Sequence, residues 1–370
     1  MYRVVKESRW WVGIILAVVL LTGCTAAKAD QLDVVYSKYS DSFFDAFDTM
    51  TQVVAYTESE EQFQQYFEQI HERFLELHQL YDIYNNYEGL NNVKTINDQA
   101  GIEPVKVSKE IIDLIQFSKE WYDKVGETNI AMGSVLELWH DYREAGIANP
   151  DQAKLPPMEG LKKAAEHIDF SKVIIDEANS TVYLEDAKMS LDVGAVAKGF
   201  ATELVAKEMK AQGMNSFMIS AGGNIRSVGK PLDGVRQRWG VGIQNPNKFI
   251  AIEEDNLLDT VFIRDASVVS SGDYQRYYTV DGVKYHHLID PKTLMPGDYY
   301  RAVTVITEDS GLADFLSTVV FLLPYEQSAA LVKKLDGVEA LWVMPDGTVR
   351  ATNGMQKMMK SHGATGARAS

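Results

Sequence analysis

Three segments in the second half of this 370-residue chain combine glycines, hydroxyls and acids in patterns that a buried core does not require. In the first, Asp192 and two glycines, Gly194 and Gly199, lead into a helix. A helix N-terminus presents unpaired backbone N–H groups and partial positive charge, and glycines let an anion approach them. The segment therefore predicts an anion-binding helix end. A generic strand-to-helix turn stays open, because the spacing matches neither the dinucleotide nor the P-loop fingerprint.

The second segment lies at the start of an apolar stretch. Asp314, Ser317 and Thr318 are spaced i, i+3 and i+4, so they share one face of a helix and offer one carboxylate and two hydroxyls. Hard oxygen ligands of this kind suit Mg²⁺, which completes its shell with water and substrate phosphates. The alternative is that Asp314 only caps the helix and that the hydroxyls are bystanders.

The third segment runs from Ser270 to Tyr274 and is followed by the adjacent pair His286 and His287. A zinc site has little support, because no cysteine lies nearby and the HExxH spacing is missing. One of the histidines as a general base or hydrogen-bond donor is one interpretation, and two ordinary strand-end residues is the other. Tyr84, in a polar loop, is a candidate to stack on a flat ligand.

The elements that must position these segments alternate without a regular βαβ period. Strands are expected at 43–56 and in a 173–184 hairpin that delivers the chain to Asp192. Helices are expected from apolar spacings of three and four at 63–81 and 108–122, and further helices at 199–212 and 313–323. This order predicts an α+β or irregular α/β fold rather than a doubly wound one.

The amino-terminal residues have the pattern of an export signal. Arg3, Lys6 and Arg9 precede an apolar run over 10–21 that is too short to span a bilayer. The run ends in Leu21-Thr22-Gly23-Cys24, which fits removal of residues 1–23 and lipidation of Cys24, with 24–40 as a lipidated tether. The alternative is an uncleaved membrane anchor with an incidental cysteine. Both place the body at the outer face of the bacterial cytoplasmic membrane.

Composition limits the partners. Cys24 is the single cysteine, so the exported chain has no internal disulfide. A net charge of −16 argues against a nucleic-acid partner and against adhesion to anionic lipid. Any anionic substrate must therefore be held by a local arrangement that works against the overall field.

In this order the segments resemble the ApbE family, the FAD:protein FMN transferases once named thiamine biosynthesis lipoproteins. The matching blocks are Leu191–Ala201, Ile219–Asn224, Ser270–Tyr278, His286–Thr293 and Ala313–Thr318, with weaker matches at Phe47–Thr49 and Asn129–Trp139. The resemblance implies a catalytic domain over 41–354 and a flexible tail over 355–370. It also implies an α+β fold of mixed sheets flanked by helices, in two intertwined subdomains with the flavin site in the cleft between them.

Such an enzyme binds FAD with Mg²⁺, cleaves the pyrophosphate, transfers FMN to a threonine or serine hydroxyl of an exported or membrane redox protein and releases AMP. The acceptor carries a Ser/Thr-Gly-Ala-Ser/Thr motif. By resemblance, the metal ligands are Ala195 through its carbonyl, Asp314, Ser317 and Thr318. The flavin-nucleotide contacts implied are Phe47, Tyr84, Glu127, Thr128, Asn129, Asp192, Lys198 and Ile289. His287 is the implied catalytic residue, assisting deprotonation of the acceptor hydroxyl.

Two other functions remain open from the sequence. One is a Mg²⁺-dependent FAD pyrophosphatase, which would use the same site with water as acceptor. The other is a non-catalytic lipoprotein that stores or presents flavin and would not need the metal ligands. The tail His362-Gly363-Ala364-Thr365 matches the acceptor motif except at His362. A flexible small-residue terminus is the alternative to self-flavinylation at Thr365.

Overall fold

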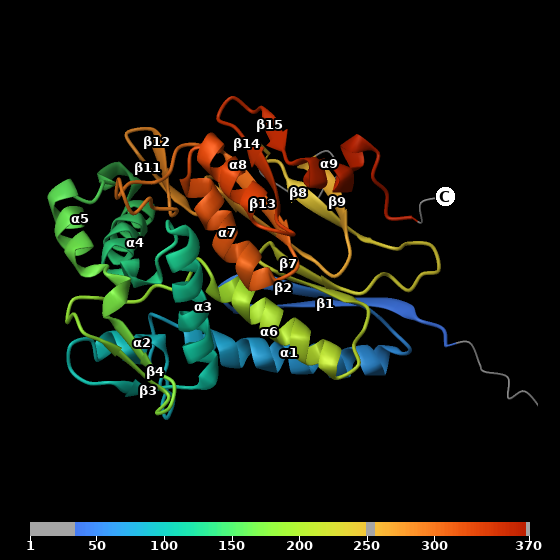
Figure 1. Cartoon of the computed structure of the whole chain (residues 1–370), viewed down its shortest axis with the longest axis horizontal. Coiled ribbons are helices and arrows are strands. Elements are labelled where there is room, and N and C mark those ends of the chain that lie inside the picture. Colours follow the sequence, from blue (N-terminus) through green and yellow to red (C-terminus); the bar gives the residue numbers. More distant parts are fainter. Residues whose placement is uncertain (1–33, 249–255, 368–370) are drawn as a thin grey trace, which may run out of the picture. The chain divides into compact units, whose positions relative to one another are not determined.

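An eight-stranded sheet forms the centre of the fold (Figure 1). Its strands stand in the order β1 (Ser37–Ala46), β2 (Thr49–Thr57), β6 (Phe217–Ala221), β7 (Asn224–Val228), β10 (Ser267–Gly272), β13 (Ala302–Thr307), β14 (Glu339–Val343) and β15 (Val349–Ala351). Every pairing among the described residues is antiparallel, whereas mixed sheets were predicted. Tight turns join β1 to β2, β6 to β7 and β14 to β15, and such turns permit only antiparallel neighbours. The α+β class is confirmed.

The computed structural model describes residues 34–248 and 256–367. The predicted signal peptide, residues 1–23, and Cys24 lie outside this range. Residues from Tyr36 onward form one compact unit, to which both predicted subdomains belong. Within the described residues no helix combines the length and apolar character that crossing a bilayer requires.

The two faces of the sheet are covered differently. Along β2, Val53 and Ala55 point to the helices, while Val54 and Tyr56 point to the opposite face. The helical face carries α1 (Glu60–Tyr81), α6 (Ala197–Ala211), α7 (Ser310–Leu322) and α8 (Tyr325–Lys334). The opposite face carries the hairpin β8 (Trp239–Gln244) and β9 (Leu257–Ile263) together with α9 (Asn353–Met358).

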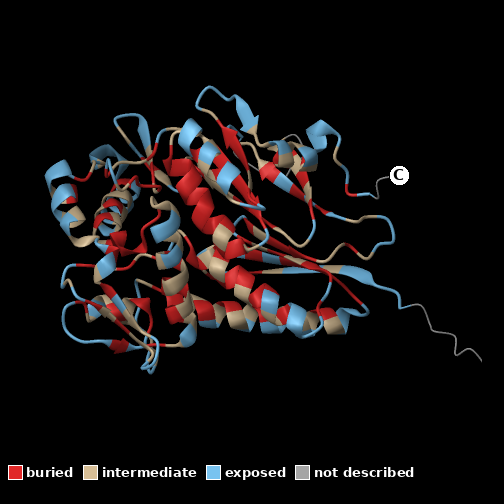
Figure 2. Cartoon of the chain, viewed as in Figure 1, coloured by how far each residue is buried: buried red, intermediate tan, exposed pale blue. Residues whose placement is uncertain are grey.

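Helices α1 and α7 follow from their sequences in different ways. The predicted α1 is confirmed: it buries one stripe and begins at Ser59, whose side chain accepts from Gln62 N. In contrast, α7 is buried almost all round (Figure 2), as its uniformly apolar sequence requires. Its N-cap is Asp309, which accepts from Leu312 N at 3.0 Å. The alternative that Asp314 only caps this helix is therefore wrong.

Beside the main sheet stands a second region built on α3 (Lys109–Val125) and α4 (Gly133–Ala148). Its remaining elements are α2 (Val93–Asp98), α5 (Met158–Ala164), the sheet of β3 (Val105–Lys106), β5 (Thr181–Leu184) and β4 (Val173–Asp176), the hairpin β11 (Tyr277–Val280) and β12 (Val283–His286), and the short 3-10 turns Ile130–Met132, Pro150–Gln152, Ala165–His167 and Phe170–Lys172. The predicted 173–184 hairpin is confirmed as β4 and β5.

Two predicted boundaries differ from the structure. The strand expected over 43–56 is a hairpin, turned by Phe47 and Asp48 at φ of 54° and 51°. Both central residues of such a turn need positive φ, and the sequence offers neither the glycine nor the asparagine that usually announces it. The tether expected to reach residue 40 ends where β1 begins, at Ser37.

The expected flexible tail is folded as far as the structure describes it. Met355 and Met359 are buried under the β8–β9 hairpin, and the 3-10 turn Lys360–His362 follows α9. Asp259 on β9 accepts from Ser361 N at 3.2 Å. Apolar burial at two spaced methionines therefore holds a segment whose small residues suggested disorder.

Candidate active site

A cavity of about 450 Å³ opens where the main sheet meets the second region. Its wall combines the β1–β2 turn, the end of α1, the 127–130 turn, α4, the segment leading into α6, the start of β7, the end of β10 and α7. Twelve of the thirteen predicted site residues line it: Phe47, Tyr84, Glu127, Thr128, Asn129, Asp192, Ala195, Lys198, His287, Ile289, Asp314 and Thr318. The fold thus brings together side chains that lie between positions 47 and 318 of the sequence.

Asp314 is a buried carboxylate on this wall that two hydrogen bonds hold in place. Its Oδ2 accepts from Gly199 N and from Asn224 Nδ2, each at 2.8 Å. Burial raises the pKa of Asp314, while Lys198 and these two hydrogen bonds oppose the rise. A desolvated carboxylate that faces a cavity favours a cation as its partner.

Gly199 permits this contact by its size. A Cβ at this position would lie 2.4 Å from Asp314 Cβ and 2.4 Å from Ser310 O, so α6 and α7 cross too closely for any side chain. The glycine that the sequence suggested for phosphate approach instead admits a neighbouring helix and its carboxylate.

The predicted anion-binding helix end is therefore only partly free. Besides Gly199 N, the N–H of Gly194 is also used, donating to Asp192 Oδ1 at 2.9 Å. The positive charge available to a phosphate comes from side chains: Lys198 and Arg276 line the cavity, and neither head group has an ion-pair partner among the described residues. Arg276 was not among the predicted site residues, although it lies in the Ser270–Tyr278 block that resembles the family.

Thr318 and Ser317 have different surroundings despite adjacent positions. Thr318 lines the cavity beside Asp314. Ser317 is fully buried outside it; its hydroxyl donates to Asp314 O at 2.8 Å and bonds to Ser271 Oγ at 2.8 Å. Because Ser317 has one proton, Ser271 is the donor in the second bond. In this conformation Ser317 supports Ser271 rather than facing the cavity.

The oxygen atoms around the cavity are of the kind that Mg²⁺ prefers. The donors available are the Asp314 carboxylate, the Thr318 side chain and the backbone of Ala195, all hard oxygens. No group of three or more histidine, cysteine or acidic side chains gathers anywhere in the described ranges. In kind, these donors fit a magnesium ion, which takes few protein ligands and completes its shell with water.

The two adjacent histidines have separate roles. His286 is buried, and its Nε2 bonds to Gly297 O at 2.7 Å. His287 is half-buried on the cavity wall, with Nδ1 3.3 Å from Arg276 O. Burial, together with Arg276, His286 and Lys198, lowers the pKa of His287 to about 3. His287 is therefore a neutral imidazole near pH 7, and its lowered pKa makes it a weak base in the free protein.

The remaining wall offers aromatic surface and unpaired polar atoms. Tyr84 is 55% exposed and lies 5.1 Å from the His140 ring. Glu127, at φ 62°, pairs with Lys292, yet its Oε2 and the Thr128 Oγ1 are buried without a hydrogen-bond partner. Buried polar atoms normally find partners, so these two favour a ligand that supplies them.

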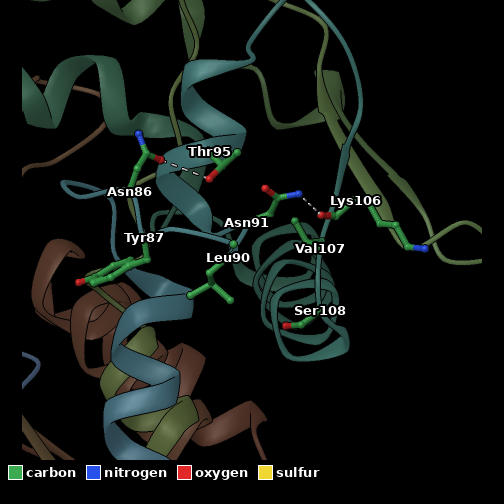
Figure 3. Close-up of a pocket in the computed structure, with 9 residues that line it drawn as sticks. Asn86, Tyr87, Leu90, Asn91, Thr95, Lys106, Val107 and Ser108 are labelled. Carbon is green, nitrogen blue, oxygen red and sulfur yellow. Dashed lines mark hydrogen bonds between the residues drawn. The ribbon is translucent and has the colours of Figure 1, made fainter.

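A second hollow, away from this cavity, lies between the 86–91 loop, α2 and β3 (Figure 3). Thr95 there donates to Asn86 Oδ1 and Asn91 donates to Lys106 O, while the Ser108 Oγ on the same wall is buried without a hydrogen-bond partner. None of the predicted site residues lines it. The candidate site is therefore the cavity around Asp314.

The antiparallel α+β domain thus brings a desolvated carboxylate, hard oxygens and the cations Lys198 and Arg276 into one cavity. Residues 47–342 match the model of the ApbE family. The chain belongs to the ApbE family, as the sequence blocks predicted.

Two curated relatives support the assignment to this family. The chain is 36% identical over 273 residues to the FAD:protein FMN transferase of Treponema pallidum (strain Nichols), covering 70% of this chain and 72% of the relative. A Klebsiella pneumoniae (strain 342) protein of the same name is 32% identical over 256 residues, covering 68% and 75%. The prediction that this chain is an enzyme of the flavin-transferase class is confirmed.

Solved structures share the fold. The crystal structure of the ApbE protein of Thermotoga maritima superposes with a TM-score of 0.75 at 26% identity, covering 88% of this chain and 99% of that one. The flavin transferase ApbE of Vibrio cholerae gives 0.70 at 21% identity, covering 88% and 100%.

Proposed function

We propose that this enzyme transfers FMN from FAD to a threonine or serine hydroxyl of an exported or membrane redox protein and releases AMP, with Mg²⁺ as cofactor. The observation that carries the proposal is the Asp314 carboxylate, buried at a helix crossing and open to a cavity that Lys198 and Arg276 also line. The names of the curated relatives, FAD:protein FMN transferase, support flavin transfer.

The metal is proposed to be held by Asp314, Thr318 and the carbonyl of Ala195. Bound there, it would supply charge neutralisation and orientation for a diphosphate, which phosphoryl transfer needs more than covalent help. Ser317 is proposed as a ligand only if its hydroxyl leaves Asp314 O and Ser271. Lys198 and Arg276 attract the diphosphate electrostatically, and Asp192 orients the loop through Gly194 N.

His287 is proposed to accept the proton of the acceptor hydroxyl. Its Nδ1 lies 3.3 Å from Arg276 O, and its depressed pKa keeps the ring neutral in the free enzyme. A diphosphate beside Lys198 and Arg276 would offset their positive charge, so it would raise the basicity of His287 when the substrate is bound.

The flavin and adenosine contacts are proposed along the rest of the cavity wall. Tyr84 and Phe47 offer ring faces, Ile289 an apolar surface, and the unpaired atoms of Glu127 and Thr128 offer hydrogen bonds. Asn129 is already engaged with Ile168 O and Ala131 N, so its role is to hold this turn in shape.

One product analysis separates transfer from the two other functions. The lipid-free protein is incubated with FAD, Mg²⁺ and a peptide that carries Thr-Gly-Ala-Thr, and AMP, FMN and peptide mass are measured. Flavinylated peptide with AMP supports the transferase; FMN and AMP with an unmodified peptide support the pyrophosphatase. Intact bound FAD supports the carrier. In the proposed enzyme, Asp314→Ala abolishes turnover, since the sole carboxylate of the metal set is lost.

The cellular location is also a proposal. Residues 1–23 and Cys24, outside the described residues, carry the lipoprotein signal, so we expect a lipid-anchored protein on the outer face of the cytoplasmic membrane. Labelling with palmitate in a bacterial host tests this. Wild type should incorporate the label and Cys24→Ala should not; equal labelling of both would exclude lipidation at Cys24.

Self-flavinylation at Thr365 finds little support in the position of the tail. The tail packs on β9 across the sheet from the helices, and no residue after Leu322 lines the cavity in the described chain. Intact mass after incubation with FAD and Mg²⁺ should show no gain on this chain.

A further inference from the structure

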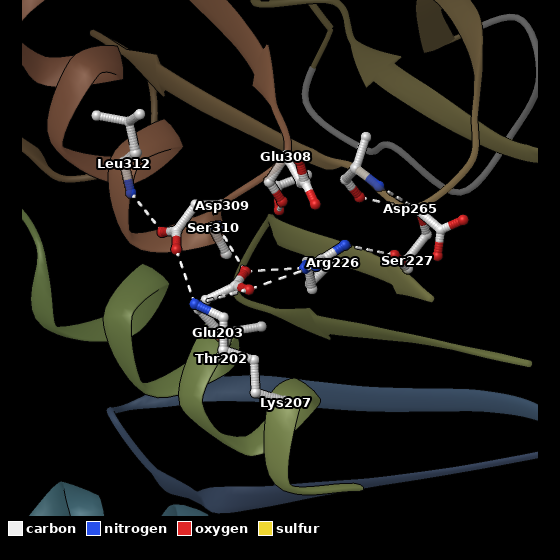
Figure 4. Close-up of polar contacts among 12 residues, drawn as sticks. Thr202, Glu203, Lys207, Arg226, Ser227, Asp265, Glu308, Asp309, Ser310 and Leu312 are labelled. Atoms are coloured by element: carbon white, nitrogen blue, oxygen red, sulfur yellow. Dashed lines mark hydrogen bonds and ion pairs between the residues drawn. The ribbon is translucent and has the colours of Figure 1, made fainter. Parts of the chain in front are cut away.

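Two polar junctions connect the same three elements, one helical turn apart. At the cavity, Asp314 of α7 meets Gly199 of α6 and Asn224 of β7. The second junction joins Glu203, Arg226 and Ser310 (Figure 4). Each of its members lies four residues along a helix, or two along the strand, from its counterpart in the first junction.

The second junction is closely bonded. Glu203 Oε2 accepts from Arg226 Nε and from Ser310 N, both at 2.8 Å, and Oε1 accepts from Arg226 Nη2 at 3.3 Å. Arg226 Nη1 donates to Ser227 O at 2.6 Å. The Glu203 and Arg226 side chains are only 6% and 9% exposed. A two-bond contact between a carboxylate and a guanidinium fixes orientation as well as distance.

Stability alone does not account for this pair. A buried ion pair is often no more stabilising than packed apolar side chains, because both charges must be desolvated. None of Glu203, Arg226 and Ser310 lines the cavity, so none contacts the ligand directly. What the pair does fix is the position of α6 and β7 against the first turn of α7, and Asp314 stands one turn further along that helix.

We propose that the Glu203–Arg226–Ser310 junction positions the Asp314 carboxylate as a cation ligand. This inference rests on the proposed function, since it assumes a divalent cation at Asp314. Glu203 and Arg226 are positioning residues: they act through the spacing of α6, β7 and α7. Without the pair, Gly199 N and Asn224 Nδ2 no longer hold Asp314 Oδ2 at a fixed place.

Metal affinity, measured without flavin, tests the inference. Mn²⁺ is titrated into the protein and free Mn²⁺ is followed by electron paramagnetic resonance. We expect Glu203→Gln to weaken Mn²⁺ binding by on the order of tenfold, as changes behind a metal ligand commonly do. The matched control is Glu208→Gln, on the same helix, which removes an ion pair with Arg73 on α1 and should leave Mn²⁺ affinity unchanged.

A double variant separates positioning from stability. Replacing both charges in Glu203→Gln/Arg226→Met removes the unpaired buried cation that the single change leaves, so we expect the melting temperature to recover. Mn²⁺ affinity should remain weak, because the fixed geometry is not restored. Recovery of affinity together with stability would reduce the pair to a structural role and overturn the inference.

The remaining outcomes distinguish the positioning role of Glu203 and Arg226 from the proposed metal site at Asp314. Equal Mn²⁺ affinity of wild type and Glu203→Gln would overturn the positioning role and leave the metal site intact. If wild type and Asp314→Asn bind Mn²⁺ equally, or wild type binds none, the proposed metal site fails and the positioning role fails with it.

Discussion

At the scale of single residues, environment decides what each ionisable group does. Asp314 and Asp192 are carboxylates whose pKa burial raises, while the pKa of His287 is lowered by burial and by neighbouring cations. Raised acids and a depressed base in one cavity are a pattern of functional sites rather than of cores. The raised pKa of the two acids and the lowered pKa of His287 both show that the charged form of each group is unfavourable in the free protein. A bound cation or anion would make the charged form more favourable.

Removing the Asp314 charge should therefore stabilise the metal-free protein. An acid whose folded pKa is raised stabilises the fold below its unfolded pKa and loses that contribution as pH rises through the folded value. At pH 7.5 the charged form is the unfavourable one, and Asp314→Asn keeps an oxygen that accepts from Gly199 N. We expect its melting temperature to exceed that of wild type by a few degrees without Mg²⁺.

The same melting measurement has an internal control. Mg²⁺ should raise the melting temperature of wild type and leave that of Asp314→Asn unchanged. A variant that is less stable than wild type, or that responds equally to Mg²⁺, would contradict the account of a carboxylate kept for a cation.

His287 should titrate far below an ordinary histidine. With a pKa of about 3 in the folded protein, the ring stays neutral at pH 5, where a solvent-exposed imidazole is protonated. Because the folded pKa is depressed, the stability that depends on neutral His287 is present above pH 6.5 and is lost as pH falls toward 3.

Nuclear magnetic resonance of ¹⁵N-labelled histidine measures this directly, with His287→Asn to assign the signal. Adding ADP, whose diphosphate is expected to lie near Lys198 and Arg276, should raise the pKa. A His287 that titrates near 6.5 in the free protein, with no response to ADP, would remove the charge argument for its role as base.

At the scale of elements, the close crossing of α6 and α7 is what creates the site. It places Asp314 against the start of α6, and it depends on Gly199, which has no room for a Cβ. Helix spacing at 313–318 predicted the shared face of Asp314 and Thr318. It did not predict that Ser317 turns to Ser271, because that contact comes from β10, 46 positions away in sequence.

Gly199→Ala tests the crossing. The added methyl would press on Asp314 Cβ and Ser310 O at 2.4 Å, so we expect a loss of about 1–3 kcal/mol in the free energy of unfolding and strongly reduced activity. Gly160→Ala in α5 is the control, because its nearest contact would be 3.4 Å and alanine favours a helix. Urea unfolding compares them; an unaffected Gly199→Ala would show that α6 and α7 need not approach so closely.

The sequence could predict features that depend on neighbouring residues, but not those that depend on contacts between distant parts of the chain. Apolar periodicity identified α1, and turn chemistry identified the β4–β5 hairpin, because both signals lie within a few residues. The Phe47–Asp48 turn was missed because phenylalanine rarely adopts positive φ and no glycine follows Asp48 to complete the usual turn signal. Arg276 and Asn224 were missed as site residues because only the fold shows that they face Asp314 and His287.

At the scale of the whole molecule, an acidic protein assembles a local cationic site. The net charge is −16, yet Lys198, Arg143 and Arg276 all line the one cavity around Asp314. Distant surface carboxylates are screened by salt, whereas cations at the cavity wall act on a ligand at short range. The global charge therefore does not prevent binding of an anionic nucleotide.

The C-terminal tail contributes to the stability of the fold, because part of it is buried in the core. Removing residues 355–370 takes Met355 and Met359 from under the β8–β9 hairpin, so we expect a loss of about 3 kcal/mol or more in the free energy of unfolding. Truncation after Ala367 is the control and should leave stability unchanged. Equal unfolding midpoints of wild type and the longer truncation would restore the picture of a flexible tail.

We propose that the cavity around Asp314 moves FMN from FAD to a protein hydroxyl with the help of Mg²⁺. The most direct measurement is the mass of a Thr-Gly-Ala-Thr acceptor after incubation with FAD and the lipid-free enzyme, with Mg²⁺ or with EDTA. With wild type and Mg²⁺, we expect the acceptor to gain the mass of one FMN less one water, and one AMP to form for each acceptor modified. With EDTA, or with Asp314→Ala, we expect no gain in mass. Flavinylation that persists in EDTA, or in Asp314→Ala with Mg²⁺, would contradict the account.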